Sequence, residues 1–269
     1  MYHLPKHPSG KIVSSNITAL NLNETVFEIE RWISFKKNNY VCVCNTHSIV
    51  TASNDPYFNE VLNNAGICTP DGMPLVWALR MYGFKGQDRV DGPNLMLKLC
   101  ELSSKNGYRI YLYGGTQQTL DQLYNQIKSQ NSSIKIVGRY SPPFRKLTDN
   151  EENEIIQKIN ASNADLIFVS LGCPKQEVWM YNNRNKVNGI MLGVGAAFDF
   201  ITGNIKRPPI IIQKFGLEWF YRLISEPKRL WKRYAYNNPM YVYRFFKTYR
   251  INKEITRNTN DSLKRRLSS

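Results

Sequence analysis

The chain has 269 residues, of which 42% are hydrophobic and 12% aromatic, so it can bury a substantial core and disorder throughout is excluded. The formal net charge of +15 predicts an anionic partner, which could be nucleic acid, a lipid surface or a phosphorylated substrate. Five cysteines form an odd set without CxxC spacing, which argues against structural zinc and favours a reducing compartment: Cys42, Cys44, Cys68, Cys100 and Cys173.

No part of the chain carries a membrane-crossing signal. The N-terminal residues lack an apolar segment behind a basic one, and no uninterrupted apolar run is long enough to cross a bilayer. We therefore expect a cytoplasmic protein.

Short apolar runs rich in β-branched residues alternate with helical patterns. The runs predict buried strands over residues 40–44, 108–115, 134–140, 165–172 and 189–195, and residues 65–70 are typical of a short strand and turn. Apolar residues at helical spacing predict helices over residues 95–102, 120–127 and 148–159, and Thr148 with Glu151 forms a capping box for the last of these. This alternation predicts an α/β fold: a Rossmann-like, mostly parallel sheet with helices on both faces.

A basic, aromatic segment follows the predicted α/β core. Residues 206–250 hold eleven Lys or Arg, only two Glu, and twelve aromatic residues, with two helical patterns broken at Pro227. We expect an α/β catalytic core over residues 1–205, with 1–20 mobile, a helical C-terminal appendage over 206–252, and a disordered tail over 253–269.

Ligands of open parallel sheets bind outside the carboxyl ends of the strands. The candidate residues at these ends are Asn45, Thr46, Gly114, Gly115, the segment 172–177 and Gly195. Glycine there allows backbone N–H groups to approach an anion, although a double glycine after a strand is also an ordinary tight turn. The chain lacks GxxxxGK[ST] and GxGxxG, so the sequence does not favour an ATPase or an ordinary dinucleotide-binding protein.

Asp71 lies between a predicted strand and the apolar helical pattern that follows it. A carboxylate at that position could simply cap the helix. Arg89 follows in "QDRVDGPNLM", where it could form a surface ion pair with Asp88 or Asp91. Neither residue by itself indicates a function.

Six segments between residues 40 and 236 together resemble the WecG/TagA/CpsF glycosyltransferase family. They are "PDGMPLVWALRMYG", "RVDGPNLM", "LYGG", "SLGCPKQE", "GVGAAFDFITGNIKRPP" and "GLEWFYRLISEPKRLWKRY". The resemblance implies a bacterial enzyme of surface or cell-wall polysaccharide biosynthesis. Such an enzyme moves a sugar from a UDP-sugar to a saccharide on undecaprenyl diphosphate, inverts the anomeric centre and needs no metal ion or other cofactor.

The resemblance also implies roles for particular residues. Asp71 matches the family's general base, Arg89 an arginine near the catalytic pocket, and Gln176 a glutamine of the active-site cleft. The chain has no DxD spacing, which many glycosyltransferases use to hold a divalent ion. It departs from the family at Val43, where similar enzymes often have Thr.

In similar enzymes the C-terminal appendage docks on the membrane and brings arginines over the pocket. Aromatic and basic residues side by side suit an anionic leaflet, and we expect peripheral association with the inner face of the cell membrane. Arginine pairs bidentately with phosphate oxygens, so Arg207, Arg222 or Arg229 is expected to contact a diphosphate. A solvated basic face on two core-packed helices is the alternative.

Two other functions remain open at this point. A nucleic-acid-binding protein would also use interleaved aromatic and basic residues, but no RRM, KH, HTH or zinc-finger pattern occurs, and we expect no nucleic-acid partner. A non-catalytic nucleotide-sugar-binding protein is the second. The sequence leaves open the donor sugar and the oligomeric state, a homo-oligomer included.

Overall fold

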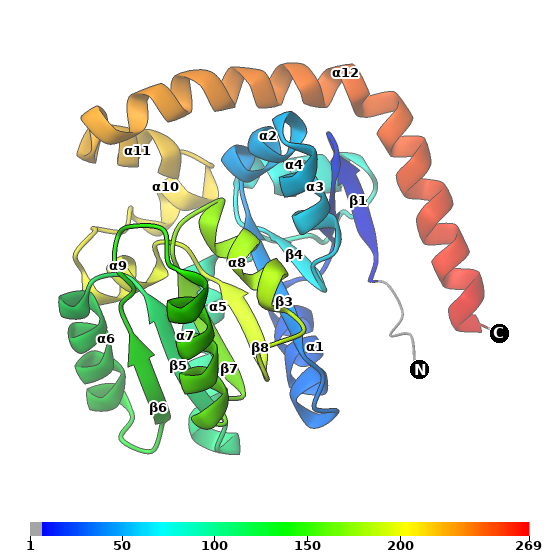
Figure 1. Cartoon of the computed structure of the whole chain (residues 1–269). Coiled ribbons are helices and arrows are strands. Elements are labelled where there is room, and N and C mark those ends of the chain that lie inside the picture. The colour runs from blue at the N-terminus through cyan, green and yellow to red at the C-terminus, as the bar shows by residue number, and fades with distance from the viewer. Residues whose placement is uncertain (1–6, 269) are drawn as a thin grey trace. The chain divides into compact units, whose positions relative to one another are not determined.

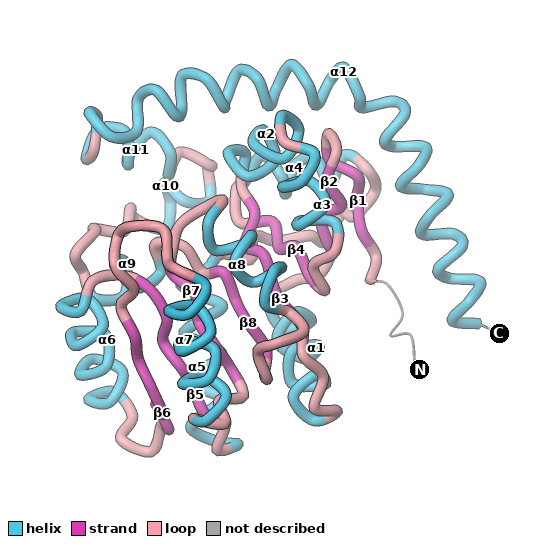
Figure 2. Tube along the Cα trace, viewed as in Figure 1, coloured by secondary structure: helices cyan, strands magenta, loops and turns pink. Residues whose placement is uncertain are grey.

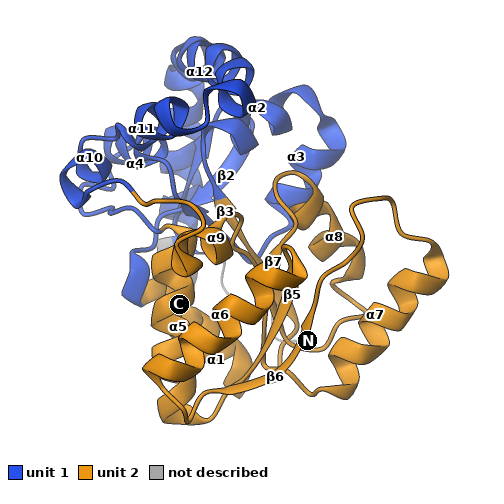
Figure 3. Ribbon diagram, turned by 90° about the vertical axis from the view of Figure 1, so that its left-hand side faces the viewer, with its two compact units in different colours: residues 1–23, 44–90, 208–269 blue, residues 24–43, 91–207 orange. Residues whose placement is uncertain are grey.

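The computed structural model describes residues 7–268 and divides into two compact units (Figure 3). Unit 1 comprises residues 1–23, 44–90 and 208–269, and unit 2 comprises residues 24–43 and 91–207. The chain therefore crosses between the units four times, whereas the sequence predicts one continuous core over residues 1–205. Each unit is described by itself.

Unit 2 is built on five parallel strands, in the order β3-β8-β7-β5-β6 (Figure 2). They are β3 (Asn39–Cys44), β5 (Arg109–Gly114), β6 (Lys135–Tyr140), β7 (Leu166–Ser170) and β8 (Ile190–Gly193). All but β6 are buried along nearly their whole length, because helices cover both faces. The edge strand β6 alternates between exposed and half-buried residues. The predicted parallel sheet is confirmed.

Helices cover both faces of this sheet, as predicted. They are α1 (Leu22–Ser34), α5 (Gly92–Asn106), α6 (Gln117–Gln130), α7 (Asp149–Ala161), α8 (Lys175–Asn183) and α9 (Ala197–Thr202). Helix α6 connects β5 to β6, and α7 connects β6 back to β7, in the opposite direction across the sheet. Because both crossovers are right-handed, α6 lies on one face of the sheet and α7 on the other (Figure 3). The predicted capping box of α7 is present, with Thr148 and Glu151 bonding reciprocally.

Unit 1 combines short strands with the C-terminal helices. Its elements are β1 (Ser9–Ile12), β2 (Ser15–Thr18), α2 (Thr46–Asn54), α3 (Pro56–Asn63), β4 (Ile67–Pro70), α4 (Met73–Met81), α10 (Ile210–Lys214), α11 (Glu218–Ser225) and α12 (Pro227–Ser268). Strands β1 and β2 form an antiparallel hairpin within residues 1–20, the stretch expected to be mobile. Ile12 and Ile17 of this hairpin are fully buried, and the Cys68 amide of β4 donates to Thr18 Oγ1 at 3.0 Å. Burial of these two side chains holds the segment in place.

Helix α12 runs past α2 and β1 and continues through residues 253–268, for which the sequence predicts a disordered tail (Figure 1). Three polar side chains at i, i+4 and i+8 face the hairpin backbone. Asn252 Nδ2 donates to Val13 O at 2.9 Å, and Thr256 Oγ1 accepts from the Lys11 amide at 3.0 Å. Asn260 accepts from the Ser9 amide at 3.2 Å and donates to Ser9 O at 2.9 Å. These bonds order a helix end whose own sequence is polar.

Within residues 7–268, no helix has both the length and the apolar character that crossing a bilayer requires.

Candidate active site

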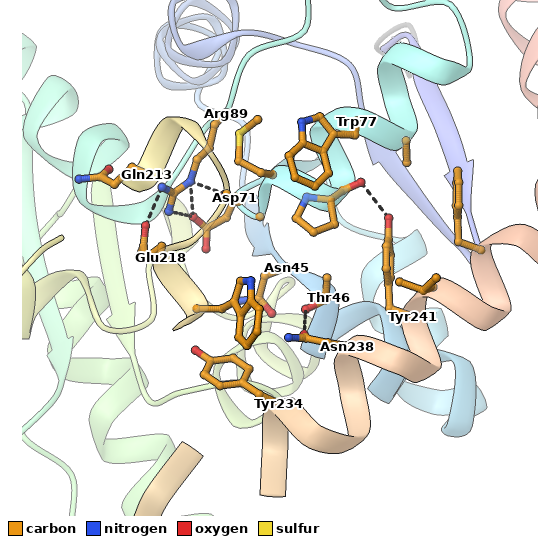
Figure 4. Close-up of a pocket in the computed structure, with 18 of the residues that line it drawn as sticks. Asn45, Thr46, Asp71, Trp77, Arg89, Gln213, Glu218, Tyr234, Asn238 and Tyr241 are labelled. Atoms are coloured by element: carbon orange, nitrogen blue, oxygen red, sulfur yellow. Dashed lines mark hydrogen bonds and ion pairs between the residues drawn. The ribbon is translucent and has the colours of Figure 1, made fainter. Parts of the chain in front are cut away.

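Unit 1 contains a cavity of about 370 Å³ (Figure 4). Its walls come from the start of α2, the β4–α4 junction, Arg89, and α10 to α12. The polar and charged side chains on these walls are Asn45, Thr46, Asp71, Arg89, Gln213, Glu218, Arg222, Arg233 and Asn238. The cavity thus contains five of the six predicted site residues of unit 1, four of which are Asn45, Thr46, Asp71 and Arg89. The fifth is Arg222.

Asp71 does not cap the helix that follows it. The N-cap of α4 is Gly72, and no side chain caps that end. The Asp71 amide donates to Cys44 O at 2.8 Å, which anchors the residue directly after β4. Its carboxylate is 22% exposed and accepts from Arg89 Nη2 at 2.8 Å and Nε at 3.3 Å, both at Oδ1. Oδ2 accepts no hydrogen bond from the described chain and is open to the cavity (Figure 4).

Arg89 lies between two carboxylates. Besides Asp71, its guanidinium contacts Glu218 of α11, with Nη1 2.7 Å from Oε2, and the arginine and Glu218 side chains are each only 17% exposed. Of the two aspartates considered as surface partners of Arg89, Asp88 pairs with Arg80 and Asp91 with Arg207. Arg89 therefore fixes the Asp71 carboxylate and joins it to the C-terminal helices.

Asn45 and Thr46 begin α2 at the cavity wall. Asn45 Oδ1 caps the helix by accepting from the amides of His47 and Ser48, while its Nδ2 donates to nothing within residues 7–268. Thr46 Oγ1 lies 3.4 Å from Asn238 Oδ1 of α12. Burial and the nearby Arg233 lower the pKa of His47 to about 4, so this imidazole is neutral at pH 7.

The C-terminal helices supply cavity residues that the sequence reasoning missed. Glu218, Trp219, Arg233 and Tyr234 all line the cavity, whereas the predicted Arg229 is 54% exposed and paired with Glu226 at 2.6 Å, outside the lining. The missed residues lie in the aromatic, basic segment that the sequence singled out. Helical periodicity alone does not tell which of its faces meets a cavity.

The glycine and glutamine candidates lie together in unit 2, at the carboxyl ends of its strands. Gly195 N donates to Gln176 Oε1 at 3.2 Å, and Gly115 N donates to Ser170 O at 3.0 Å. At Gly114, with φ +112°, a Cβ would lie 2.3 Å from Ser170 O, so no other residue fits. The backbone amides of Gly115 and Gly195 already donate hydrogen bonds within the protein. These glycines therefore leave room for a ligand and do not provide free N–H donors to it.

Gln176 itself is held by a buried acid. The amide is 2% exposed and its Nε2 donates to Glu177 Oε1 at 2.8 Å. Burial raises the pKa of Glu177 to about 7. Arg207, the remaining candidate, also belongs to unit 2, where its Nη2 lies 2.8 Å from Asp91 Oδ1. The predicted residues therefore form one group in each unit, and Arg207 and Arg229 are each tied to a neighbouring acid.

Unit 2 contains a parallel α/β sheet, and unit 1 contains a cavity that holds a carboxylate, a guanidinium and several aromatic rings; these features are typical of an α/β enzyme. The family model "Glycosyl transferase WecG/TagA/CpsF family" matches residues 11–255. The chain belongs to this family of glycosyltransferases.

Two curated relatives carry the same name, N-acetylglucosaminyldiphosphoundecaprenol N-acetyl-beta-D-mannosaminyltransferase. The relative from Bacillus subtilis (strain 168) is 32% identical over 222 residues, which cover 81% of this chain and 84% of the relative. The relative from Bacillus spizizenii is 30% identical over 212 residues, covering 78% of this chain and 80% of the relative. By their names, both transfer N-acetylmannosamine to an acceptor on undecaprenyl diphosphate.

Proposed function

We propose that this enzyme transfers a sugar from a UDP-sugar to a saccharide carried on undecaprenyl diphosphate, with inversion and with Asp71 as general base. The names of the two relatives support the acceptor class. The observation that carries the mechanism is the arrangement of Asp71, with Oδ1 held by Arg89 and Oδ2 open to the cavity.

In the proposed reaction the acceptor hydroxyl attacks the anomeric carbon of the donor as Oδ2 takes its proton. The bond from that carbon to the diphosphate oxygen breaks, and UDP leaves with one more negative charge. A base positioned in this way contributes about 10²–10⁴-fold in rate. Arg89 prevents the carboxylate from rotating, so Oδ2 stays directed into the cavity.

Arginines in the cavity are proposed to stabilise the leaving diphosphate in place of a metal ion. Arg222 and Arg233 line the cavity with Arg89, and a planar guanidinium can pair with two phosphate oxygens at once. Arg207 and Arg229 pair with Asp91 and Glu226 and do not line the cavity, so we rank them behind Arg222, which lines it although its Nη2 lies 3.8 Å from Glu226 Oε1.

In unit 2, we propose that the segment around Gly114, Gly115, Gln176 and Gly195 contacts the donor. A Cβ added at Gly195 would meet nothing within 4 Å, so a ligand can approach the backbone there. Gln176 keeps the Gly195 turn in shape through its side-chain oxygen.

The C-terminal helices are proposed to hold the enzyme on the inner leaflet. Their exposed apolar side chains include Ile210, Ile211, Phe215, Phe220, Ile224 and Trp231, and the exposed basic ones include Lys214, Lys228 and Lys232. Each basic residue near an anionic leaflet contributes about 1 kcal/mol. The full-length triple variant Lys214→Glu, Lys228→Glu and Lys232→Glu should no longer sediment with anionic vesicles at low salt. Undiminished sedimentation would contradict peripheral docking.

The function is tested by a transfer assay with a panel of UDP-sugars and a lipid diphosphate bearing N-acetylglucosamine, run in EDTA. Wild type should turn over one of the donors, and Asp71→Asn should lose at least about a hundredfold in kcat. Loss of wild-type activity on chelation would contradict the metal-free mechanism. An Asp71→Asn variant as fast as wild type would contradict the base.

A further inference from the structure

The cavity of unit 1 is charged at one end and apolar at the other. Asp71, Arg89 and Glu218 lie together on one side of it, and Tyr241 of α12 lies on the opposite side, hydrogen-bonded to Pro74 O at 3.0 Å (Figure 4). Six of the lining residues contributed by α4 and α12 form what we call the α4–α12 wall: Trp77, Met81, Tyr241, Val242, Phe245 and Phe246. The same helix α12 also contributes Arg233, Tyr234 and Asn238 to the lining, and these are not part of the wall.

Four side chains of the α4–α12 wall expose apolar surface beside a reactive carboxylate. Trp77 is 45% exposed, Met81 41%, Val242 51% and Phe246 63%. Contiguous exposed apolar surface of this kind marks a binding site in a folded protein, because leaving it in water has no structural benefit.

Behind these side chains lies a rigid aromatic floor. Phe245 and Tyr241 are each 4% exposed and stack with their ring centroids 6.0 Å apart. Phe245 also packs against Tyr82 at 6.0 Å and against Phe246 at 5.4 Å. The wall is therefore formed by packed rings on two helices, so an apolar ligand would not have to order it on binding.

The wall offers a nucleotide or a sugar few hydrogen-bond partners. The polar edges of a uracil and the hydroxyls of a sugar must each find a hydrogen-bond partner when they leave water. The Tyr241 hydroxyl already donates to Pro74 O, and apart from the Trp77 indole N–H the other wall side chains are apolar. A flexible hydrocarbon chain needs no such partners.

We propose that the α4–α12 wall binds the first isoprene units of the polyprenyl acceptor. This inference rests on the proposed function, which places the acceptor's sugar and diphosphate at the charged end of the same cavity. The wall continues from that end, so the chain would run along α4 and α12 as it leaves the diphosphate. The acceptor would thus be recognised by its lipid as well as by its head group.

The test uses soluble prenyl diphosphates with one, two and three isoprene units: dimethylallyl, geranyl and farnesyl diphosphate. Their affinities for the full-length enzyme are measured by calorimetry. Half-burying a branched five-carbon unit should tighten binding by roughly tenfold for each added unit, from one to two and from two to three. In the double variant Val242→Ser, Phe246→Ser this dependence on chain length should flatten, while affinity for UDP stays unchanged.

The matched control is the double variant Tyr243→Ser, Ile251→Ser. These α12 side chains are 61% and 66% exposed, comparable to the mutated pair, but they do not line the cavity. The control should keep the wild-type dependence on chain length. Equal affinity of wild type for all three diphosphates, or the same loss in the control, would overturn the proposal.

Failure of the inference and failure of the proposed function give different results. If wild type transfers sugar equally well to acceptors of every chain length, the function stands and the lipid site falls. If no UDP-sugar is transferred to any acceptor but prenyl diphosphates still bind in proportion to their length, the lipid site stands and the proposed reaction falls.

Discussion

The Arg89–Glu218 ion pair connects the proposed base to the C-terminal helices, and Glu218→Gln tests whether that connection matters for the reaction. The substitution keeps the shape of the side chain and removes its charge. Arg89 then keeps its ion pair with Asp71 and loses the one with Glu218. We expect the guanidinium to be held less firmly, and with it the Asp71 carboxylate.

The size of the effect follows from the geometry of the pair. Unit charges about 4 Å apart attract by about 4 kcal/mol at an effective dielectric of 20, before the cost of desolvating both groups. A charge-assisted hydrogen bond between side chains this little exposed keeps about 1.5–3 kcal/mol, and a neutral one about 1 kcal/mol. Glu218→Gln should therefore loosen Arg89 by about 1–2 kcal/mol, which corresponds to roughly a tenfold fall in kcat.

The assay is steady-state transfer at saturating donor and acceptor, with Asp88→Asn as the control. Asp88 is next to Arg89 in the sequence and is also ion-paired, to Arg80 at 3.1 Å, but it does not line the cavity. Glu218→Gln should lower kcat with little change in KM for the UDP-sugar, and Asp88→Asn should change neither.

A double-mutant cycle gives a second test. Because Glu218 acts through Arg89 on Asp71, adding Glu218→Gln to Asp71→Asn should cost much less than it does in wild type. An unchanged kcat in Glu218→Gln, or strictly additive losses in the cycle, would refute the reasoning.

Three further predictions concern stability. The pKa of Glu177 is raised from an ordinary 4.5 to about 7, so the native state loses stability as pH rises from 4.5 to 7 and this carboxyl must ionise. Glu177→Gln should therefore raise the free energy of unfolding by up to about 3 kcal/mol above pH 7 and by little below pH 4.5. Thermal melts at pH 4 and pH 8 check this, and equal differences at both would contradict it. Gly114→Ala should lower Tm by roughly 5 °C or more, because its Cβ meets Ser170 O at a positive φ, and a melt within a degree of wild type would exclude the clash. Asn260→Ala should speed protease cleavage near the end of α12, whereas Ser262→Ala, on a side chain that bonds only within the helix, should not.

The core of unit 2 could be predicted because its signals are local. Strands such as β7 (Leu166–Ser170) are buried along nearly their whole length and therefore appear as continuous apolar runs. The α7 capping box depends on two residues three positions apart. The hairpin of residues 9–18 escaped prediction because each strand has four residues, too few to show a period. The end of α12 escaped because its order comes from hydrogen bonds to residues about 250 positions away.

The sequence by itself determined the parallel α/β core, the family and the residue types available for acid–base chemistry, since each of these depends on neighbours along the chain. Tertiary structure alone decided which of these residues share a cavity. Arg89 meets Glu218, 129 positions further on, and α4 meets Tyr241 because the chain returns to unit 1 after residue 207. A contact of that kind depends on how segments far apart in sequence pack together, and no local pattern of residues encodes it.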